Sequence, residues 1–224
     1  MLRVEFHCHT IFSKDSLVSP RALVDGSARK GIDRVVVTDH NSIAGARAAQ
    51  ALDPERVIVG EEVMTTQGEL LAAFVEDALP AGLTPREAIR RLRQQGAFIS
   101  VSHPFDSWRH GGWQEEHLLE ILPLVDAIEV FNSRCMAPGS NEAADAFARR
   151  QEVPTTVGSD AHTVWELGRS TLLLPSFGSA DELRNVLLEG VPKTRMSPQW
   201  IHLSSRFARM WKMINGSLDM SQPP

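Results

Sequence analysis

Imidazole and carboxylate side chains recur at the ends of short apolar segments of this chain. The clearest case is the segment Arg34–His40, where a run of valines is followed by Thr38, Asp39 and His40. A buried strand gains nothing from a carboxylate and an imidazole at its end unless a site there uses them. Histidine together with carboxylate ligands favours zinc, manganese or iron over calcium, so these residues suggest metal-dependent chemistry.

The same pattern occurs at four other places. The segments are VEFHCH at 4–9, VIVGEE at 57–62, FISVSHP at 98–104 and TTVGSDAH at 155–162. For any one histidine at a strand end, a buried and hydrogen-bonded side chain is the more common explanation. Five strands, however, do not each place a polar group at the same end by accident. The set therefore predicts one shared site.

Strands and helices alternate along the chain. Strands are expected at 3–8, 34–38, 57–63, 69–75, 98–102, 126–131, 155–158 and 172–174. Helices are expected at about 20–29, 42–51, 85–95, 115–122, 140–150 and 179–189, the first opening at Ser19-Pro20. This alternation indicates an α/β fold, and 224 residues suit one α/β barrel. The carboxyl ends of its strands would carry the site.

Three parts are expected: a barrel domain at 1–195, a helix packed on the barrel at 196–216 and a flexible tail at 217–224. The helical segment places large apolar side chains at helical spacing. They are Trp200, Leu203, Phe207, Met210, Trp211 and Ile214. They could contact a second copy or a membrane, but packing on the barrel wall is the expectation for a terminal helix of this kind.

Charge and composition exclude several classes of partner. The net charge of −5 provides no basic field for a long nucleic-acid duplex. Two cysteines are too few for a disulfide scaffold, and no apolar run of membrane-spanning length or targeting motif occurs. A cytoplasmic protein without membrane contact is the expectation, and its oligomeric state stays open.

The ordered set of motifs resembles the polymerase-and-histidinol-phosphatase (PHP) family of phosphoesterases. The matching motifs are HCHT at 7–10, TDHN at 38–41, GEE at 60–62, SHP at 102–104 and GSDAH at 158–162. Each motif alone is weak, but five in the family's order form a specific signal. The resemblance implies a distorted (β/α)7 TIM-like barrel with two or three divalent ions (Mn, Zn or Fe) at the carboxyl ends of its strands.

The resemblance also implies a distribution of ligands. One ion would be held by His7, His9, Glu62 and Asp160. Glu62 would bridge to a second ion that His103 also binds, and a third ion would be held by Asp15, His40 and His162. Asp15 stands where many relatives have histidine. Because strand side chains alternate, Glu61 would lie at the surface or behind the site.

One ligand of the family has no counterpart here. Relatives usually supply a further histidine before the HP motif, whereas no histidine occurs from 63 to 102. Glu69, which opens the adjacent strand, is the candidate substitute. The alternative for Glu69 is a solvated carboxylate at a strand edge.

The implied mechanism uses a metal-bridging hydroxide to attack a phosphate ester. Asp160 would orient the water or take its proton, and His162 or His103 could protonate the leaving group. Candidate groups for the substrate phosphate are Arg134, Arg109 and Asn132, since a guanidinium binds phosphate through two hydrogen bonds. Asp39 is expected to orient His40 rather than to bind metal.

The favoured function is hydrolysis of a small phosphomonoester, a nucleotide or the end of an oligonucleotide. An amidohydrolase-like enzyme that cleaves a C–N or C–O bond is the alternative, because a binuclear barrel site serves both chemistries. A non-catalytic regulatory barrel is the remote alternative. The nearly complete ligand set disfavours it.

Overall fold

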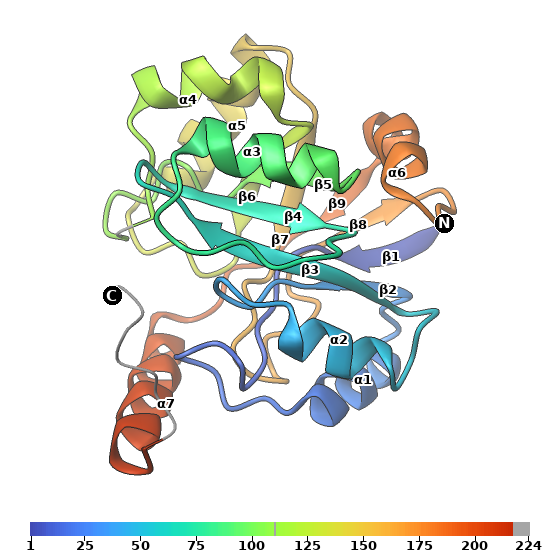
Figure 1. Cartoon of the computed structure of the whole chain (residues 1–224), viewed down its shortest axis with the longest axis vertical. Coiled ribbons are helices and arrows are strands. Elements are labelled where there is room, and N and C mark those ends of the chain that lie inside the picture. The colour runs from blue at the N-terminus through green and yellow to red at the C-terminus, as the bar shows by residue number, and fades with distance from the viewer. Residues whose placement is uncertain (110, 217–224) are drawn as a thin grey trace.

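A nearly closed, strongly curved sheet forms the centre of the molecule (Figure 1). The computed structural model describes residues 1–109 and 111–216, so the tail predicted at 217–224 lies outside the described residues. In the described chain the strands are ordered β7-β6-β5-β4-β3-β2-β1-β8-β9. Their bounds are β1 Leu2–Glu5, β2 Arg34–Val37, β3 Val57–Met64, β4 Glu69–Ala73, β5 Phe98–Val101, β6 Ala127–Asn132, β7 Thr155–Gly158, β8 Thr171–Leu174 and β9 Val191–Lys193.

Strands β1 to β7 form the wall of the barrel. The pairs β1–β2, β2–β3, β5–β6 and β6–β7 are parallel, and β4 runs antiparallel to both of its neighbours. Past β1 and β7, a parallel bridge joins Cys8 to Ala161, and the His9 N–H donates to the Ala161 carbonyl at 2.8 Å. The predicted distorted (β/α)7 barrel is confirmed, with β4 as the source of its distortion.

Helices cover the outside of the sheet (Figure 1). They are α1 Pro20–Arg29, α2 Ala44–Gln50, α3 Pro85–Gln94, α4 Glu115–Ile121, α5 Ser140–Arg150, α6 Ala180–Val186 and α7 His202–Ile214, with short 3-10 turns at Leu122–Leu124, Leu187–Glu189 and Gln199–Ile201. The predicted cap of α1 is confirmed, because the Ser19 side chain accepts from the Ala22 N–H and Pro20 opens the helix. Thr84 and Ser179 cap α3 and α6 in the same way.

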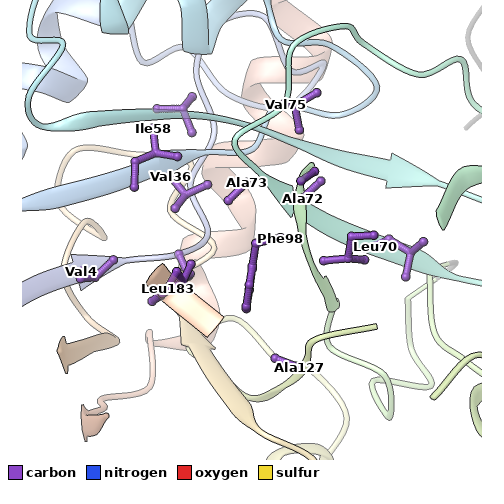
Figure 2. Packing of buried hydrophobic residues seen from close by; sticks show 14 of the residues in the cluster. Val4, Val36, Ile58, Leu70, Ala72, Ala73, Val75, Phe98, Ala127 and Leu183 are labelled. Carbon is purple, nitrogen blue, oxygen red and sulfur yellow. The ribbon is translucent and has the colours of Figure 1, made fainter. Parts of the chain in front are cut away.

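Apolar side chains from the strands and the covering helices form one buried cluster. Figure 2 shows members of it from β1 to β6 and from α6, including Phe98 of β5. The Phe98 ring lies 6.4 Å from the ring of Phe6. Each such buried side chain contributes about 1.5–3 kcal/mol to folding relative to an exposed one. This core fixes the strand ends that carry the polar residues.

The structure differs from the prediction at three elements. The first strand ends at Glu5 rather than at residue 8, because the Glu5 carboxylate turns back to accept from the His7 N–H. The helix expected to Glu189 ends at Val186 and continues as a 3-10 turn. A strand that was not predicted, β9, pairs antiparallel with β8.

Helix α7 contacts the barrel through polar groups. The Lys212 ammonium donates to the carbonyls of Ile11 and Ser13, and the Arg134 guanidinium donates to Ser205 Oγ at 3.0 Å. The large apolar side chains of this segment instead face solvent, contrary to the expectation that they pack on the barrel wall. None of the helices in residues 1–109 and 111–216 is both long and apolar enough to cross a membrane.

Candidate metal centre

The ligand-type side chains predicted from the sequence meet at one end of the barrel. His7 and His9 follow β1, His40 follows β2 and His103 follows β5, so all lie at the carboxyl ends of parallel strands. Glu69 opens β4, which is antiparallel, and therefore its first residue reaches the same end. The reversed strand explains how Glu69 joins the histidines.

Four side chains converge on one point at the barrel centre. The Nε2 atoms of His7 and His9 are 3.1 Å apart. Both lie near Glu62 Oε2, at 3.3 and 3.4 Å, and near Asp160 Oδ1, at 3.6 and 3.3 Å. Ligand atoms about 2.0–2.2 Å from a metal in a tetrahedral site lie roughly 3.3–3.6 Å from one another. The spacing of the His7, His9 and Glu62 atoms therefore fits a single ion, and Asp160 Oδ1 lies beside this group.

The hydrogen bonds of the two imidazoles show why a cation fits between them. His7 Nδ1 donates to Glu129 Oε1 at 3.0 Å, and His9 Nδ1 donates to Ser13 Oγ at 3.0 Å, because that hydroxyl gives its own proton to Asp39. In the neutral form that metal binding requires, with each proton on Nδ1, both Nε2 atoms direct lone pairs at one another. A shared cation turns this repulsion into coordination.

Glu62 links this point to a second cluster. Its Oε2 lies 3.0 Å from His40 Nδ1, and its Oε1 lies 3.2 Å from His103 Nε2. Glu69 Oε2 lies 3.4 Å from the same His103 nitrogen. Among the described residues, His40, Glu62 and Glu69 form one of the groups whose ligand atoms all lie within 4.8 Å of one another.

A third cluster forms around Asp15. Its Oδ1 lies 3.2 Å from His162 Nε2 and 3.6 Å from His40 Nε2, and it is buried without a hydrogen bond. Its Oδ2 accepts from the Arg209 guanidinium of α7 at 2.9 Å. A buried carboxylate oxygen without a donor is costly unless a cation satisfies it, so Asp15 Oδ1 is also suited to a metal.

Electrostatics lower the pKa of two carboxylates of this site. Burial alone would raise the pKa of Asp160, but the Arg109 guanidinium outweighs it and holds the pKa well below its ordinary value. Burial would also raise the pKa of Glu62, and the neighbouring imidazoles hold it well below 4.5. Burial and the nearby Glu62 instead raise the pKa of Glu69. Burial and then the charges of His162 and His40 lower the pKa of His9 to about 4.

Two of the site residues adopt unusual backbone conformations. His103 and Asp160 have φ values of 22° and 52°, in the left-handed region that non-glycine residues rarely occupy. Such conformations cost about 1–3 kcal/mol each and persist where the surroundings enforce them, most often at functional sites. Asn41, Phe74 and Glu152 also have positive φ, so the site contains two of the five such non-glycine residues in the described chain.

The two neighbouring glutamates of β3 point in opposite directions. Glu62 faces the histidines, whereas the Glu61 carboxylate accepts from the Leu79 N–H at 3.0 Å. Glu61 is fully buried, so the surface position considered for it is wrong. Burial raises the pKa of Glu61 to about 8, and the side chain is largely protonated at neutral pH.

Several residues that orient the site were not found from the sequence. Glu129 accepts from His7 Nδ1 through Oε1, while its Oε2 accepts from the His103 N–H at 2.9 Å and from Asn132 Nδ2 at 3.1 Å. Ser102 Oγ donates to Glu62 Oε1 at 2.8 Å. A glutamate in the middle of the apolar strand AIEVFN was the available signal for Glu129, since a buried carboxylate needs donors.

Replacement of Glu129 by glutamine should weaken metal binding about 10- to 100-fold, because the carboxylate fixes the proton of His7 and the backbone of His103. An amide NH2 in place of Oε2 would meet two donors, the His103 N–H and Asn132 Nδ2. Chelator competition titrations measure the affinity. Glu142→Gln, on α5, is the control and should leave it unchanged. Equal affinity in Glu129→Gln and wild type would contradict this role.

A pocket of about 460 Å³ opens onto the second and third clusters. Its wall includes Arg109 and Arg134 from the barrel and Arg206 and Arg209 from α7. Arg109 Nη1 lies 2.6 Å from Asp160 Oδ2. Arg134 is almost fully buried, with its Nε 3.2 Å from Glu166 Oε1. Both arginines predicted to meet the substrate therefore lie at the pocket, and Arg109 is the closer of the two to Asp160.

Asn132 and Asp39 make contacts that were not predicted for them. Asn132 was expected to contact the substrate, but its Nδ2 donates to Glu129 and Asp160 and its Oδ1 accepts from the Arg134 N–H. It is buried and leaves no polar group for a substrate, so it braces the two carboxylates instead. Asp39 was expected to orient His40. Its carboxylate accepts from Thr10 and Ser13, and the Ser13 Oγ in turn accepts from the His40 N–H at 3.2 Å and from His9 Nδ1. The orienting role of Asp39 stays a prediction.

Comparisons with known proteins agree with this geometry. The family model described as PHP-associated matches residues 138–192. Two uncharacterized proteins of Methanocaldococcus jannaschii are similar to the chain. One is 36% identical over 172 residues, which are 75% of this chain and 69% of the relative. The other is 31% identical over 145 residues, 59% of this chain and 82% of the relative.

Solved structures share the fold. A two-domain protein of Bacteroides vulgatus that contains a predicted PHP-like metal-dependent phosphoesterase aligns with a TM-score of 0.69 at 23% identity, over 87% of this chain and 65% of that one. An amidohydrolase of Chromobacterium violaceum aligns at 0.59 and 15% identity, over 91% and 96% of the two chains. A lesion-specific endonuclease of Pyrococcus furiosus aligns at 0.58 and 17% identity, over 86% and 57%. With the family model and a relative that is 36% identical over 172 residues, these likenesses show that the chain belongs to the PHP family.

Proposed function

We propose that this protein is a metal-dependent hydrolase of phosphate esters. The observation that carries the proposal is the convergence of two imidazole Nε2 atoms and two carboxylate oxygens, beside a pocket lined with arginines. The PHP-like metal-dependent phosphoesterase and the lesion-specific endonuclease among the similar structures support the same reaction class.

The proposed metal ligands form three groups that share members. His7, His9, Glu62 and Asp160 would hold the first ion. Glu62, with His103 and Glu69, would hold the second, and Asp15, His40 and His162 would hold the third. Sites that combine imidazole nitrogens with carboxylate oxygens suit manganese, zinc or iron.

Divalent ions at these positions would supply a nucleophile from water near neutral pH and neutralise charge on the phosphate. The chain's own residues would then position the reaction. Asp160 would hold the first ion through Oδ1, near His9 Nε2, while its Oδ2 pairs with Arg109, so the guanidinium fixes a carboxylate that would orient the attacking water. Arg109 still faces the pocket and can donate to a phosphate oxygen. His103 and His162 are the candidates for returning a proton to the leaving group.

The proposed substrates are small phosphomonoesters, nucleotides or oligonucleotide ends. A pocket of about 460 Å³ is within the usual range for small-molecule sites. The net charge of −5 disfavours binding of a long nucleic-acid duplex across the surface outside the pocket. The cytoplasmic location predicted from the sequence stays a prediction.

A second candidate is an amidohydrolase-like enzyme. The likeness to the Chromobacterium violaceum amidohydrolase, a structure with bound sulfate, favours it as the alternative. The arginines of the pocket favour phosphate over a neutral amide, because a guanidinium matches the geometry and charge of a phosphate.

A substrate screen tests the proposal. Purified protein loaded in turn with Mn²⁺, Zn²⁺ or Fe²⁺ is offered p-nitrophenyl phosphate, bis(p-nitrophenyl) phosphate, histidinol phosphate, nucleoside bisphosphates, short oligonucleotides and p-nitroanilides. Phosphate release at least about 10²-fold above metal-stripped protein is the expected result. Turnover of the anilides alone would replace the proposal with the amidohydrolase alternative, and turnover of none would contradict both.

A further inference from the structure

Helix α7 turns its apolar side away from the barrel. The residues that α7 buries are Ser205, Ala208 and Lys212. Its exposed side chains are large and apolar, with Leu203 62%, Phe207 51% and Met210 52% exposed. A surface helix normally buries its apolar stripe against its own domain. This reversed arrangement leaves a stripe that needs another surface.

The stripe has the spacing of a helix-pairing seam. Its members are Met196, Trp200, Leu203, Phe207, Met210 and Ile214, each at least 41% exposed. Along the chain they are separated by four, three, four, three and four residues, and the four from Leu203 to Ile214 lie on α7. Within α7 this is the alternation of the a and d positions that lets two helices pack together along a shared seam. Trp211 and Met213, 52% and 60% exposed, widen the apolar face beyond this seam.

We propose that this seam, from Met196 to Ile214, pairs with the same seam of a second copy of this chain. The two copies would form a closed, two-fold dimer in which each seam is covered by the other. A buried aromatic side chain covers about 150–250 Å². Six large side chains, each about half exposed, therefore leave roughly 600–800 Å² per copy, close to the ~800 Å² per partner of a stable interface.

The basic residues of α7 argue for a protein partner rather than a lipid surface. A membrane-bound helix directs its lysines and arginines at anionic headgroups beside its apolar stripe. Here Lys212 is buried on carbonyls of Ile11 and Ser13, and Arg209 is paired with Asp15. These cations serve the protein's own pocket. The net charge of −5 further opposes attraction to an anionic membrane.

The seam also continues onto the barrel. The Trp200 ring lies 5.7 Å from the ring of Trp165, which is 48% exposed. The guanidinium carbon of Arg169 lies over the Trp165 ring, 3.8 Å from its centroid. This contact anchors the start of the seam. Because the opposite side of α7 holds Asp15 through Arg209, pairing of the seams would fix the helix that braces the third cluster.

Sedimentation velocity of the full chain between about 1 and 100 μM tests the proposal. The wild type should sediment as a dimer of twice the 24.8 kDa chain mass. Leu203→Glu with Met210→Glu should raise the dissociation constant at least ~100-fold, since charge at the centre of a buried seam is poorly tolerated. Leu188→Glu, at a residue 81% exposed on another element, is the matched control and should stay dimeric.

A second double variant tests whether a lost dimer could be due to misfolding. Leu203→Ala with Phe207→Ala adds no charge and keeps helix propensity, and it should raise the dissociation constant about 10-fold or more with an unchanged thermal melting curve. A monomeric wild type at 100 μM would overturn the proposal, as would a dimer that survives all seam variants. Flotation of monomeric protein with phosphatidylserine-containing vesicles, lost in Leu203→Glu, would assign the seam to a membrane and overturn it as well.

Discussion

Replacement of Glu62 by glutamine is expected to lower kcat/KM by at least ~10³-fold and to remove bound metal. Both oxygens of Glu62 face imidazole nitrogens: Oε2 lies near His7, His9 and His40, and Oε1 lies near His103. An amide keeps the size of the side chain, but its NH2 cannot ligate and its charge is gone. Because Glu62 is shared by two proposed ion positions, metal content should fall by more than one ion.

The adjacent residue provides a matched control. Glu61 is equally buried on the same strand, but it faces Leu79 and is largely protonated at neutral pH, because burial raises its pKa to about 8. Glu61→Gln should therefore preserve metal content and turnover. Elemental analysis and steady-state kinetics on both variants give the comparison. Equal losses in the two would show that a carboxylate anywhere in this strand is needed for folding rather than for metal.

Replacement of Asp160 by asparagine is expected to lower kcat by about 10³-fold or more. The Oδ1 of Asp160 lies among the nitrogens of His7 and His9, and its Oδ2 holds Arg109 at 2.6 Å. Asparagine tolerates the left-handed backbone at this position, where φ is 52°, so the variant tests the charge rather than the chain geometry. Turnover of the best phosphate ester from the screen is the measurement.

The control for Asp160 is Asp145→Asn on α5, where the carboxylate is exposed and pairs with Arg149. It should keep full activity. If Asp160→Asn retained wild-type kcat with unchanged metal content, neither the water-orienting role nor the position at the first ion would stand. A fall in metal content with normal kcat in the loaded fraction would support only the ligand role.

The strand-end pattern was sufficient to predict the barrel and the convergence of the histidines. Parallel strands put their carboxyl ends on one side, so residues such as His7, His40 and His103 could be grouped without coordinates. Strand alternation also required that only one of Glu61 and Glu62 face the site, and the family resemblance selected Glu62. The grouping rests on local periodicity, which the sequence carries directly, and the choice of Glu62 rests on the resemblance.

Other features depend on tertiary contacts that no spacing records. The reversal of β4 brings Glu69 to the histidines, and only the pairing of β4 with both neighbours reveals it. Asn132 stood at a strand end like the ligands, yet Glu129 and Asp160 occupy its amide. The apolar pattern of α7 was assigned to the barrel wall, but the barrel covers Ser205, Ala208 and Lys212 and leaves the large apolar side chains exposed. Periodicity identifies a face and not what covers it.

Elemental analysis of the protein after loading with Mn²⁺, Zn²⁺ or Fe²⁺ and removal of free ions tests the central claim most directly. The wild type should retain two or three ions per chain, and Glu62→Gln should retain fewer by more than one while Glu61→Gln matches the wild type. Retention of less than one ion under every loading condition would contradict the metal centre and the function built on it.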